Sequence, residues 1–396
     1  MRLAKIMNNA PEIQPSTVKR QPSSVFDCAI IGGGLAGLTL AIQLANTGYS
    51  VVLFEKETYP YHKVCGEYIS MESFNFLERL GVPLSEMNLP KITELLVSSP
   101  DSNFFQRQLD LGGFGISRYT LDNYLAQLAK RKGVKVLEGT KVTDVNFEND
   151  GFKIKTDKGD YKSKVACGTY GKRSVLDKKL GRNITPDKNE KNYVGVKYHI
   201  KLDFPSDRIE LHNFKDGYCG ISKVDGDRFC LCYLTDAQNL KNNANDIKTM
   251  ERNVLMQNDF LKKYFTKAEF LYTEPLTISQ VTFRKKSAVE NHVLMLGDAA
   301  GAIAPLCGNG MSLAMRAAFE ATPIIKNYLE GRITREILEK TYKKTWNNKF
   351  AFRIAVGRNI QHLFGKERMT NVAFRILNQM PFVIDKLIEL THGKTF

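Results

Sequence analysis

A glycine-rich loop near the start of the chain constrains the fold more than any other feature. The apolar run VFDCAII predicts a buried strand, and LTLAIQLANTG has the spacing of a helix. Between them stand Gly32, Gly34 and Gly37 in the pattern G-x-G-x-x-G. The first glycine permits a tight turn, the second lets a pyrophosphate approach the backbone, and the third lets helix and strand pack closely. The helix N-terminus adds amide donors and the positive end of a dipole.

A carboxylate follows at the distance that such a site needs. Glu55 lies 23 residues after Gly32, at the end of the second apolar strand in YSVVLFEK. There it can accept hydrogen bonds from both hydroxyls of an adenosine ribose, and it would repel a 2′-phosphate. The strand, loop, helix, strand and acidic end together predict a Rossmann-like βαβ unit. Further cofactor contacts are expected from Leu35, Ala36 and Lys56.

A second glycine-bearing turn stands far along the chain, in LMLGDAAGAIAPLCGNGMSLAMRAA. Its order is a strand, a Gly-Asp pair, a turn of small residues, a proline, and Gly-Asn-Gly at the start of a helix. This order resembles the second FAD-binding motif of the large flavoprotein family that includes aromatic hydroxylases, geranylgeranyl reductases and flavin-dependent halogenases. The resemblance covers the chain from about residue 27 to about residue 321 and implies FAD as the cofactor. The residues that it adds to the cofactor site are Asp298, Pro305, Gly308, Gly310 and Met311.

The resemblance also implies roles for single residues. The family's aspartate at the place of Asp298 bonds the ribityl chain, and the helix that begins near Asn309 points its N-terminus at the pyrimidine end of the flavin. A reduced flavin carries negative charge at that end, and a helix N-terminus stabilises such an anion by about 1 kcal/mol. Arg118, in SRYTLDNYL, matches an arginine that contacts the cofactor near its pyrophosphate, although a surface arginine would look the same. Val142 matches a position whose backbone meets the adenine, and a purely structural valine is the alternative.

The segment HKVCGEYIS, residues 62–70, resembles a loop of the reductase branch that carries a basic residue and Cys-Gly beside the isoalloxazine ring. Gly66 would permit close approach of a flat ring. The thiol of Cys65 could donate a proton or shape the pocket, which makes Cys65 the candidate catalytic residue; a buried, inert cysteine is the alternative. Lys63 and Gly66 are expected to bind the cofactor, and Glu67 to form a structural or surface salt bridge.

Departures from the family patterns bear on the reaction. The single tryptophan, Trp346, argues against the Trp-x-Trp-x-Ile-Pro signature of halogenases. Gly301 stands where aromatic hydroxylases usually have histidine, which favours the reductase branch. An expected Asp-Gly pair is replaced by Cys-Gly at Cys167, so the electron donor stays open among NADPH, NADH and ferredoxin. The aromatic-rich substrate signature of archaeal prenyl reductases is missing, and Cys219, near its place, could line a pocket or belong to the core.

The cysteines and charges limit the compartment and the partners. Seven cysteines, without a CxxC pair or metal-ligand spacing, indicate a reducing, cytoplasmic compartment and no metal site. The sequence contains no run of about 18 apolar residues, so we expect no membrane-spanning helix. The net charge is +15, and residues 331–396 hold 13 Lys and Arg against 5 Asp and Glu, a net +8. These basic amphipathic helices are expected to close the domain, with peripheral contact to anionic lipid as the alternative. Nothing resembles a nucleic-acid-binding motif, and no pattern specifies an oligomeric state.

The predicted fold class is α/β of mixed type: a Rossmann-like FAD-binding domain, an interleaved antiparallel β-sheet substrate domain and C-terminal helices. The expected parts are a flexible tail over residues 1–24, an FAD-binding domain over 25–190 and 281–330 with a β meander at 134–167, a substrate domain over 191–280, and a helical region over 331–396.

The expected function is that of an FAD-dependent oxidoreductase. In the leading hypothesis, hydride from reduced flavin reduces a carbon–carbon double bond of a hydrophobic, prenyl or other lipid-like substrate. Two alternatives stay open. One is a flavin-dependent monooxygenase that hydroxylates an aromatic or lipidic substrate, and the other is a non-catalytic, flavin-containing lipid-binding protein.

Overall fold

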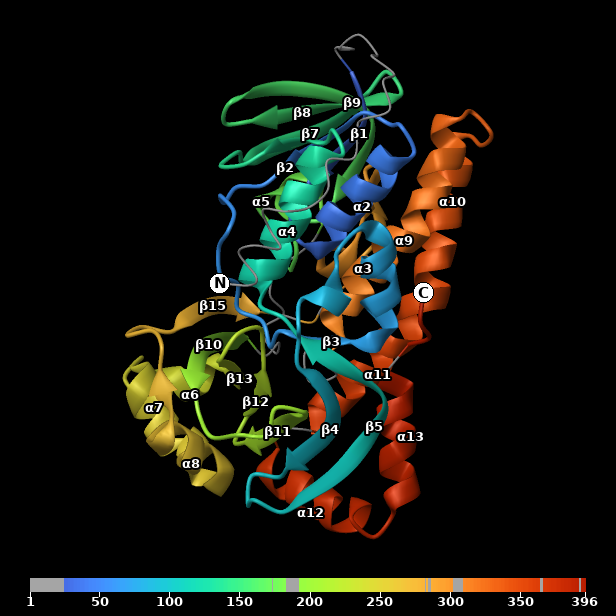
Figure 1. The fold of residues 1–396 in the computed structure, drawn as a ribbon. Helices are drawn as coiled ribbons and strands as arrows, with labels where there is room; N and C mark the ends of the chain where they lie inside the picture. The colour runs from blue at the N-terminus through green and yellow to red at the C-terminus, as the bar shows by residue number, and fades with distance from the viewer. Residues whose placement is uncertain are drawn as a thin grey trace.

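The chain folds around two β-sheets, with a set of helices at its C-terminal end (Figure 1). The computed structural model describes residues 25–172, 174–182, 192–281, 283, 286–301, 309–363, 366–391 and 393–396. The expected tail over residues 1–24, Pro305 and Gly308 lie outside the described residues.

The first sheet forms the Rossmann-like half. Its strands run in the order β16-β17-β9-β1-β2-β6, and the neighbours from β17 to β6 are parallel. Two further strands extend it as an antiparallel meander on β9. The strands are β1 (Phe26–Ile31), β2 (Val51–Phe54), β6 (Lys135–Leu137), β7 (Val142–Glu148), β8 (Gly151–Thr156), β9 (Gly159–Gly168), β16 (Val289–Glu290) and β17 (Val293–Met295).

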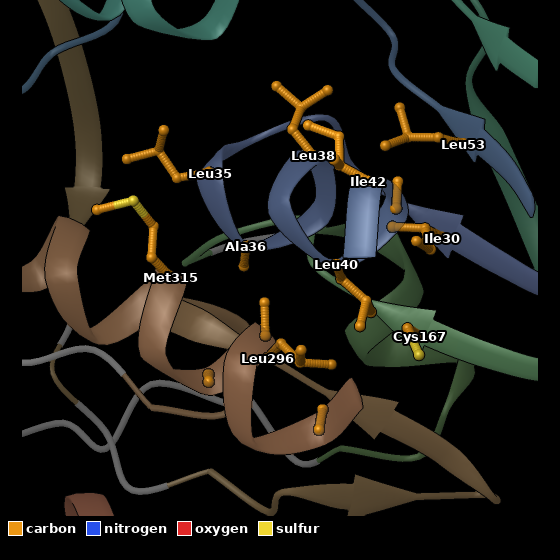
Figure 2. Close-up of a cluster of buried hydrophobic side chains, with 14 of the residues drawn as sticks. Ile30, Leu35, Ala36, Leu38, Leu40, Ile42, Leu53, Cys167, Leu296 and Met315 are labelled. Atoms are coloured by element: carbon orange, nitrogen blue, oxygen red, sulfur yellow. The ribbon is translucent and has the colours of Figure 1, made fainter. Parts of the chain in front are cut away.

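Helix α2 (Leu35–Asn46) is the centre of this half. It contacts both α4 (Arg118–Arg131) and α9 (Gly310–Leu329), which leaves it almost no face toward water. Its residues are accordingly apolar nearly all round, as expected for a helix buried on several sides. Figure 2 shows Leu38, Leu40 and Ile42 of this helix within the core. The short helices nearby are α3 (Phe74–Leu80) and α5 (Val175–Lys179).

The second sheet has the strand order β14-β10-β13-β12-β11-β4-β5-β3, with β15 paired to β10. Three of its strands, from residues 68 to 115, belong to the range expected for the FAD-binding domain. They pair antiparallel with one another, and β4 joins them to the rest of the sheet by parallel pairing with β11. The strands are β3 (Tyr68–Ser70), β4 (Lys91–Ser98), β5 (Phe104–Gly115), β10 (Tyr193–Lys201), β11 (Arg208–Phe214), β12 (Gly217–Lys223), β13 (Phe229–Asp236), β14 (Glu269–Phe270) and β15 (Leu276–Val281).

The two faces of this sheet differ in the size of their side chains. On one face bulky residues such as Tyr198 and Tyr233 pack with residues of α7 (Ile247–Asn253) and α8 (Asp259–Lys267), which follow α6 (Ala237–Asn242). Cys219 belongs to this packed cluster, so the question left open by the sequence is answered in favour of the core. The register puts smaller residues on the opposite face, because neighbouring side chains alternate along each strand. These smaller residues are Gly195, Gly220, Ser222, Cys230 and Cys232, and they share the face with larger ones, Tyr193, Lys197, His199, Tyr218 and Leu234.

Helices make up the C-terminal part. They are α10 (Arg335–Trp346), a π-helical turn (Asn347–Ala351), α11 (Phe352–Leu363), α12 (Glu367–Leu377) and α13 (Pro381–Thr391). Figure 1 shows α10 beside the first sheet, and α12 and α13 beside β4 and β5. The parallel sheet, the antiparallel sheet and these helices confirm the predicted α/β fold class. Among the described residues, no helix is both long enough and apolar enough to cross a bilayer.

Candidate functional site

The three glycines of the loop have different surroundings, and these match the roles expected of them. A Cβ built on Gly32 would lie 2.6 Å from the carbonyl oxygen of Thr169, and one on Gly37 would lie 2.1 Å from the carbonyl oxygen of Gly32. Both positions therefore exclude side chains by close packing. A Cβ built on Gly34 would have Nη2 of Arg118 as its nearest neighbour, at 3.9 Å. The second glycine thus leaves space where a pyrophosphate would approach.

Glu55 is buried at the end of β2 and fixes this loop. Its Oε2 accepts a hydrogen bond from the Gly33 amide at 2.8 Å, and its Oε1 accepts one from the Glu57 amide at 3.1 Å. The backbone amide of Thr140 donates to the Glu55 carbonyl at 2.9 Å, which brings the segment before β7, the strand that begins at Val142, next to Glu55.

Lys56 behaves differently from its neighbours. Its exposed ammonium lies 3.5 Å from Glu57, on the solvent side of the strand end. The described contacts give it no part in the glycine loop.

The second glycine-bearing turn lies against the first. A Cβ on Gly297, whose φ is +59°, would lie 3.4 Å from Cβ of Ala36 and 3.3 Å from Cβ of Ala314. The turn that carries Asp298 is therefore packed between the starts of α2 and α9, although 261 residues separate Ala36 from Gly297. Asp298 itself is half-buried. Such a meeting of two turns is what one two-part nucleotide would need.

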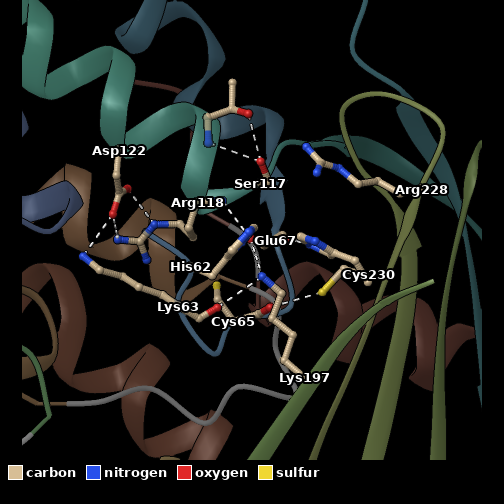
Figure 3. Close-up of polar contacts among 12 residues, drawn as sticks. His62, Lys63, Cys65, Glu67, Ser117, Arg118, Asp122, Lys197, Arg228 and Cys230 are labelled. Carbon is tan, nitrogen blue, oxygen red and sulfur yellow. Dashed lines mark hydrogen bonds and ion pairs between the residues drawn. The ribbon is translucent and has the colours of Figure 1, made fainter. Parts of the chain in front are cut away.

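Arg118 is half-buried, and its side chain is held by an ion pair. Its Nε and Nη2 each donate to Asp122 at 2.7 Å, and Lys63 Nζ lies 3.0 Å from the same carboxylate (Figure 3). Burial alone would raise the pKa of Asp122, but the charges of Arg118 and Lys63 lower it. Two cations thus share one anion beside Gly34, which leaves positive charge for a phosphate.

The loop with Cys65 joins the two halves of the molecule. Cys65 is half-buried, and its Sγ lies 3.6 Å from Sδ of Met311 at the start of α9. A Cβ on Gly66 would meet nothing within 4 Å, so there is open space beside the backbone here. On the other side, Cys230 of β13 donates to the Cys65 carbonyl at 3.2 Å. These contacts leave a thiol and an open glycine next to the N-terminus of α9.

Glu67 is fully buried and lies in the left-handed region, with φ of +57°. Its carboxylate accepts from Lys197 Nζ at 2.5 Å and from His199 Nε2 at 2.6 Å, and the Arg118 amide donates to it at 2.8 Å. Burial alone would raise the pKa of Glu67, yet the hydrogen bond from His199 and the charge of Lys197 lower it. The expected salt bridge exists, and it is a buried one.

A chain of hydrogen bonds leads from Glu67 toward the surface. His199 Nδ1 lies 2.6 Å from the Tyr272 hydroxyl, which lies 3.2 Å from Nε2 of His62. The His62 ring stacks on Tyr119, with centroids 4.6 Å apart, and Tyr119 is exposed. Because the Glu67 carboxylate can only accept, His199 Nε2 carries the proton of their hydrogen bond. When the His199 ring is neutral, Tyr272 donates to its Nδ1 and His62 donates to Tyr272.

Sequence reasoning missed Lys197, His199 and Tyr272. The signal for the first two was present in YVGVKYHI, where a lysine and a histidine alternate with apolar residues on a predicted strand. Such an alternation normally means a polar face toward water. Here both side chains are fully buried, because the loop with Cys65 covers this face.

Three ligand-type atoms of Glu67, His199 and Cys230 lie within 4.8 Å of one another. A metal ion could use such a set, but the ammonium of Lys197 already provides the cation at Glu67. Burial raises the pKa of Cys230 well above its usual value, so its sulfur is a neutral thiol and a poor metal ligand. The arrangement is that of a buried ion pair.

Cys167 stands at the place of the missing aspartate, inside the first sheet. It lies on β9 between Ile30 and Leu294, and its Sγ is 3.9 Å from Sγ of Cys28. An aspartate here would be a buried charge without a described partner, which costs several kcal/mol. A cysteine in place of the aspartate therefore suits the apolar core around Cys167.

The fold and the paired turns define a flavoprotein of the FAD-dependent oxidoreductase class. The chain belongs to the family described as FAD binding domain, which it matches over residues 25–348. This confirms FAD as the cofactor and confirms the resemblance to the superfamily of geranylgeranyl reductases and aromatic hydroxylases.

Curated relatives agree at low identity. The chain is 25% identical over 360 residues to conditioned medium factor receptor 1 of Dictyostelium discoideum, covering 83% of this chain and 68% of that protein. It is 26% identical to digeranylgeranylglycerophospholipid reductase 1 of Methanosphaera stadtmanae, covering 80% and 79%. It is 23% identical to geranylgeranyl diphosphate reductase of Synechocystis, covering 88% of each.

Solved structures share the fold. A flavin-dependent brominase superposes with a TM-score of 0.76 at 20% identity, covering 94% of both chains. A geranylgeranyl bacteriochlorophyll reductase-like protein of Thermoplasma acidophilum gives a TM-score of 0.72 at 18% identity, covering 93% of this chain and 92% of that one. At these identities the likeness speaks for the fold alone.

Proposed function

We propose that this protein reduces carbon–carbon double bonds of a hydrophobic, prenyl-like substrate. The observation that carries the proposal is the Lys63–Gly66 loop, where a half-buried thiol and an open glycine lie beside the N-terminus of α9. The names of the archaeal and cyanobacterial relatives, which are geranylgeranyl reductases, support the same substrate class.

The cofactor would be held by both glycine-bearing turns. In this proposal Gly34, with the first amides of α2, binds the pyrophosphate, Glu55 the adenosine ribose, and Asp298 the ribityl chain. Arg118 supplies positive charge near the pyrophosphate while Asp122 keeps its guanidinium in place. When bound, FAD supplies the hydride that the reduction needs.

The substrate would lie against the face of the second sheet that carries small residues. Glycine and cysteine side chains on β10, β12 and β13 leave more room there than the tyrosines and phenylalanines of the opposite face. The same face also carries the buried Lys197 and His199, so the proposal assigns the hydrocarbon chain only to the part lined by glycine and cysteine.

Reduction of a double bond also needs a proton, and we assign its supply to the hydrogen-bonded chain that ends at Glu67. For this transfer the His62 ring has to turn so that its buried Nδ1 takes a proton from solvent; the Nε2 proton of His62 then passes to Tyr272, the hydroxyl proton of Tyr272 to Nδ1 of His199, and the Nε2 proton of His199 to Glu67. Because the pKa of Glu67 is lowered, this carboxyl passes its proton on rather than keeping it. We assign the delivery to substrate to the thiol of Cys65, which is half-buried and stands two residues before Glu67.

The lipid-like substrate has consequences for location and partners. A prenyl lipid is dissolved in membranes, so the proposal includes peripheral contact with a membrane surface. The six described cysteines are all free thiols, which supports a reducing, cytoplasmic compartment. The electron donor is to be sought among NADPH, NADH and ferredoxin.

Mass analysis of products tests the proposal. The protein with reduced FAD is mixed with geranylgeranyl diphosphate, once without oxygen and once in air. We expect a gain of about two mass units per reduced bond without oxygen, together with reoxidation of the flavin. A gain of about sixteen mass units only in air would replace the proposal by the monooxygenase alternative. Tight binding without reoxidation in either case would replace it by the non-catalytic lipid-binding alternative.

A further inference from the structure

Helix α12 carries an apolar stripe that faces solvent. Its exposed members Met369, Val372 and Ile376 are 50 to 54% accessible. Their spacing of three and four residues puts them on one side of the helix. Met380 in the turn after α12 and Phe382 at the start of α13 continue the apolar surface, at 49% and 79%. The stripe consists of Met369, Val372, Ile376, Met380 and Phe382.

The opposite side of α12 attaches the helix to the second sheet. Phe374 is buried and stacks on Phe105 of β5 with ring centroids 5.4 Å apart. The side-chain amide of Asn378 donates to the Phe104 carbonyl at 3.3 Å. The stripe is therefore held outward by packing on the other side, and it is a fixed surface of the protein.

Positive charge flanks the stripe on both edges. At 100° per residue, Arg368 and Arg375 stand along one edge and Lys366 along the other, and all three are exposed. Among the described residues of the helix, the acidic one, Glu367, stands well away from the stripe. A central apolar band between rows of Lys and Arg is the arrangement of helices that lie in the headgroup region of an anionic membrane.

We infer that the stripe on α12, together with Phe382, docks this protein on anionic lipid membranes. The inference deepens the proposed function by naming the surface through which a lipid-like substrate would be reached. A second copy of the chain fits the same surface less well, because a two-fold pairing would bring the arginine edges of both copies together, although Arg375 has an acidic neighbour in Asp101 at 4.0 Å. Figure 1 shows α12 next to β4 and β5, at the end of the molecule away from β7 and β8.

Vesicle binding of the full holoprotein tests the inference. The probes are vesicles of phosphatidylcholine alone and of equal parts phosphatidylcholine and phosphatidylglycerol, and sedimentation measures the bound fraction. We expect binding to the anionic vesicles that weakens with added salt. Ile376→Glu should lower the partition coefficient about tenfold or more, because it loses one inserted side chain and adds a repelled charge. The matched control is Ile337→Glu on α10, an isoleucine of similar exposure, which should bind like the wild type.

The charged edge has its own matched pair of variants. Arg368→Gln with Arg375→Gln should reduce binding to anionic vesicles about tenfold, since each basic residue contributes at the surface. Lys343→Gln with Lys344→Gln, which removes the same charge from α10, should leave binding unchanged. Equal losses in both pairs would mean attraction by net charge only and would overturn the inference.

Two further outcomes also overturn it. One is that the wild type binds neither kind of vesicle. The other is a dimer that forms without lipid and dissociates in Ile376→Glu, which would make the stripe an interface between copies. These measurements involve no turnover, so they separate this inference from the proposed function. If vesicles bind and prenyl substrate is not reduced, the reductase proposal fails while the docking surface stands. If the substrate in detergent is reduced and vesicles do not bind, the reverse holds.

Discussion

The glycine loop and the Glu67 cluster show two different ways to build a site. At the loop, the geometry depends on the absence of side chains: close packing excludes a Cβ at Gly32 and Gly37, and Gly34 leaves space. At the cluster, the geometry depends on polar side chains from two segments far apart in the sequence, with Glu67 on one and Lys197 and His199 on the other, all fully buried. The residues that form the glycine loop all lie in one short stretch of sequence. The Glu67 cluster exists only after the chain has folded.

The largest effect should come from breaking the buried ion pair. Lys197→Met leaves the Glu67 carboxylate buried without its ammonium partner, and we expect a loss of about 3–5 kcal/mol in the free energy of unfolding. Urea denaturation of the holoprotein measures it. Lys201→Met, on the same strand but in an exposed pair with Glu269 at 3.3 Å, is the matched control and should change stability by less than about 1 kcal/mol.

A double variant sharpens this test. Glu67→Gln with Lys197→Met removes both charges, so it should be more stable than Lys197→Met alone. If the single variant is as stable as the wild type, the pair contributes nothing and the contrast between the two sites is lost.

The glycine loop should respond in ligand binding more than in stability. Gly34→Ala places a methyl group in the open space, so we expect FAD affinity to fall about tenfold to a hundredfold while the apoprotein unfolds within about 1 kcal/mol of the wild type. Flavin fluorescence titration measures the affinity. Gly48→Ala, also in open space but beyond the end of α2, should keep the affinity of the wild type, although an alanine at its φ of +85° costs some stability. Equal affinities of Gly34→Ala and the wild type would contradict the placement of the pyrophosphate.

Acid should weaken the ion pairs that Arg118 and Lys63 form with Asp122 beside the glycine loop. The folded state lowers the pKa of Asp122, so its stabilisation is present above the unfolded value of about 3.9 and is lost as pH falls through the lower, folded value. Each unit of lowering is worth about 1.4 kcal/mol. Asp122→Asn should therefore flatten the acid side of a plot of unfolding free energy against pH, below about pH 4. An unchanged slope would show that another carboxylate carries it.

The smallest effect should come from the middle of the hydrogen-bonded chain. Tyr272→Phe removes the hydroxyl between His199 and His62 and should cost about 1 kcal/mol of stability. Burial lowers the pKa of His62, and because the hydroxyl is bonded to Nε2 of His62, the titration curve of His62 should shift in NMR spectra. Tyr161→Phe, a half-buried tyrosine that packs on Phe54, should leave this curve unchanged. If the His62 curve of Tyr272→Phe matches the wild type, the proton path assigned here is wrong.

The contrast between the glycine loop and the Glu67 cluster also separates what the sequence predicted from what it did not. The βαβ unit, the fold class and the cofactor were predictable because backbone recognition needs glycines at fixed spacing, and the spacing is visible at Gly32, Gly34 and Gly37. The partner of Glu67 was not, because Lys197 lies 130 residues away and its strand carries no spacing that points to residue 67. The membership of β3, β4 and β5 in the second sheet was also missed, since strand pairing across the chain depends on tertiary contacts.

The cysteine-bearing loop has a mechanical consequence. It is bonded on one side to Asp122 of α4 through Lys63, and on the other to Lys197 and Cys230 of the second sheet. A small rotation between the two halves would therefore pull on both sides of this segment at once and shift the thiol of Cys65 relative to Met311. A hinge movement on loading or release of a ligand would therefore change the position of this sulfur. The rate at which alkylating reagents modify Cys65 would then measure how far the two halves have turned.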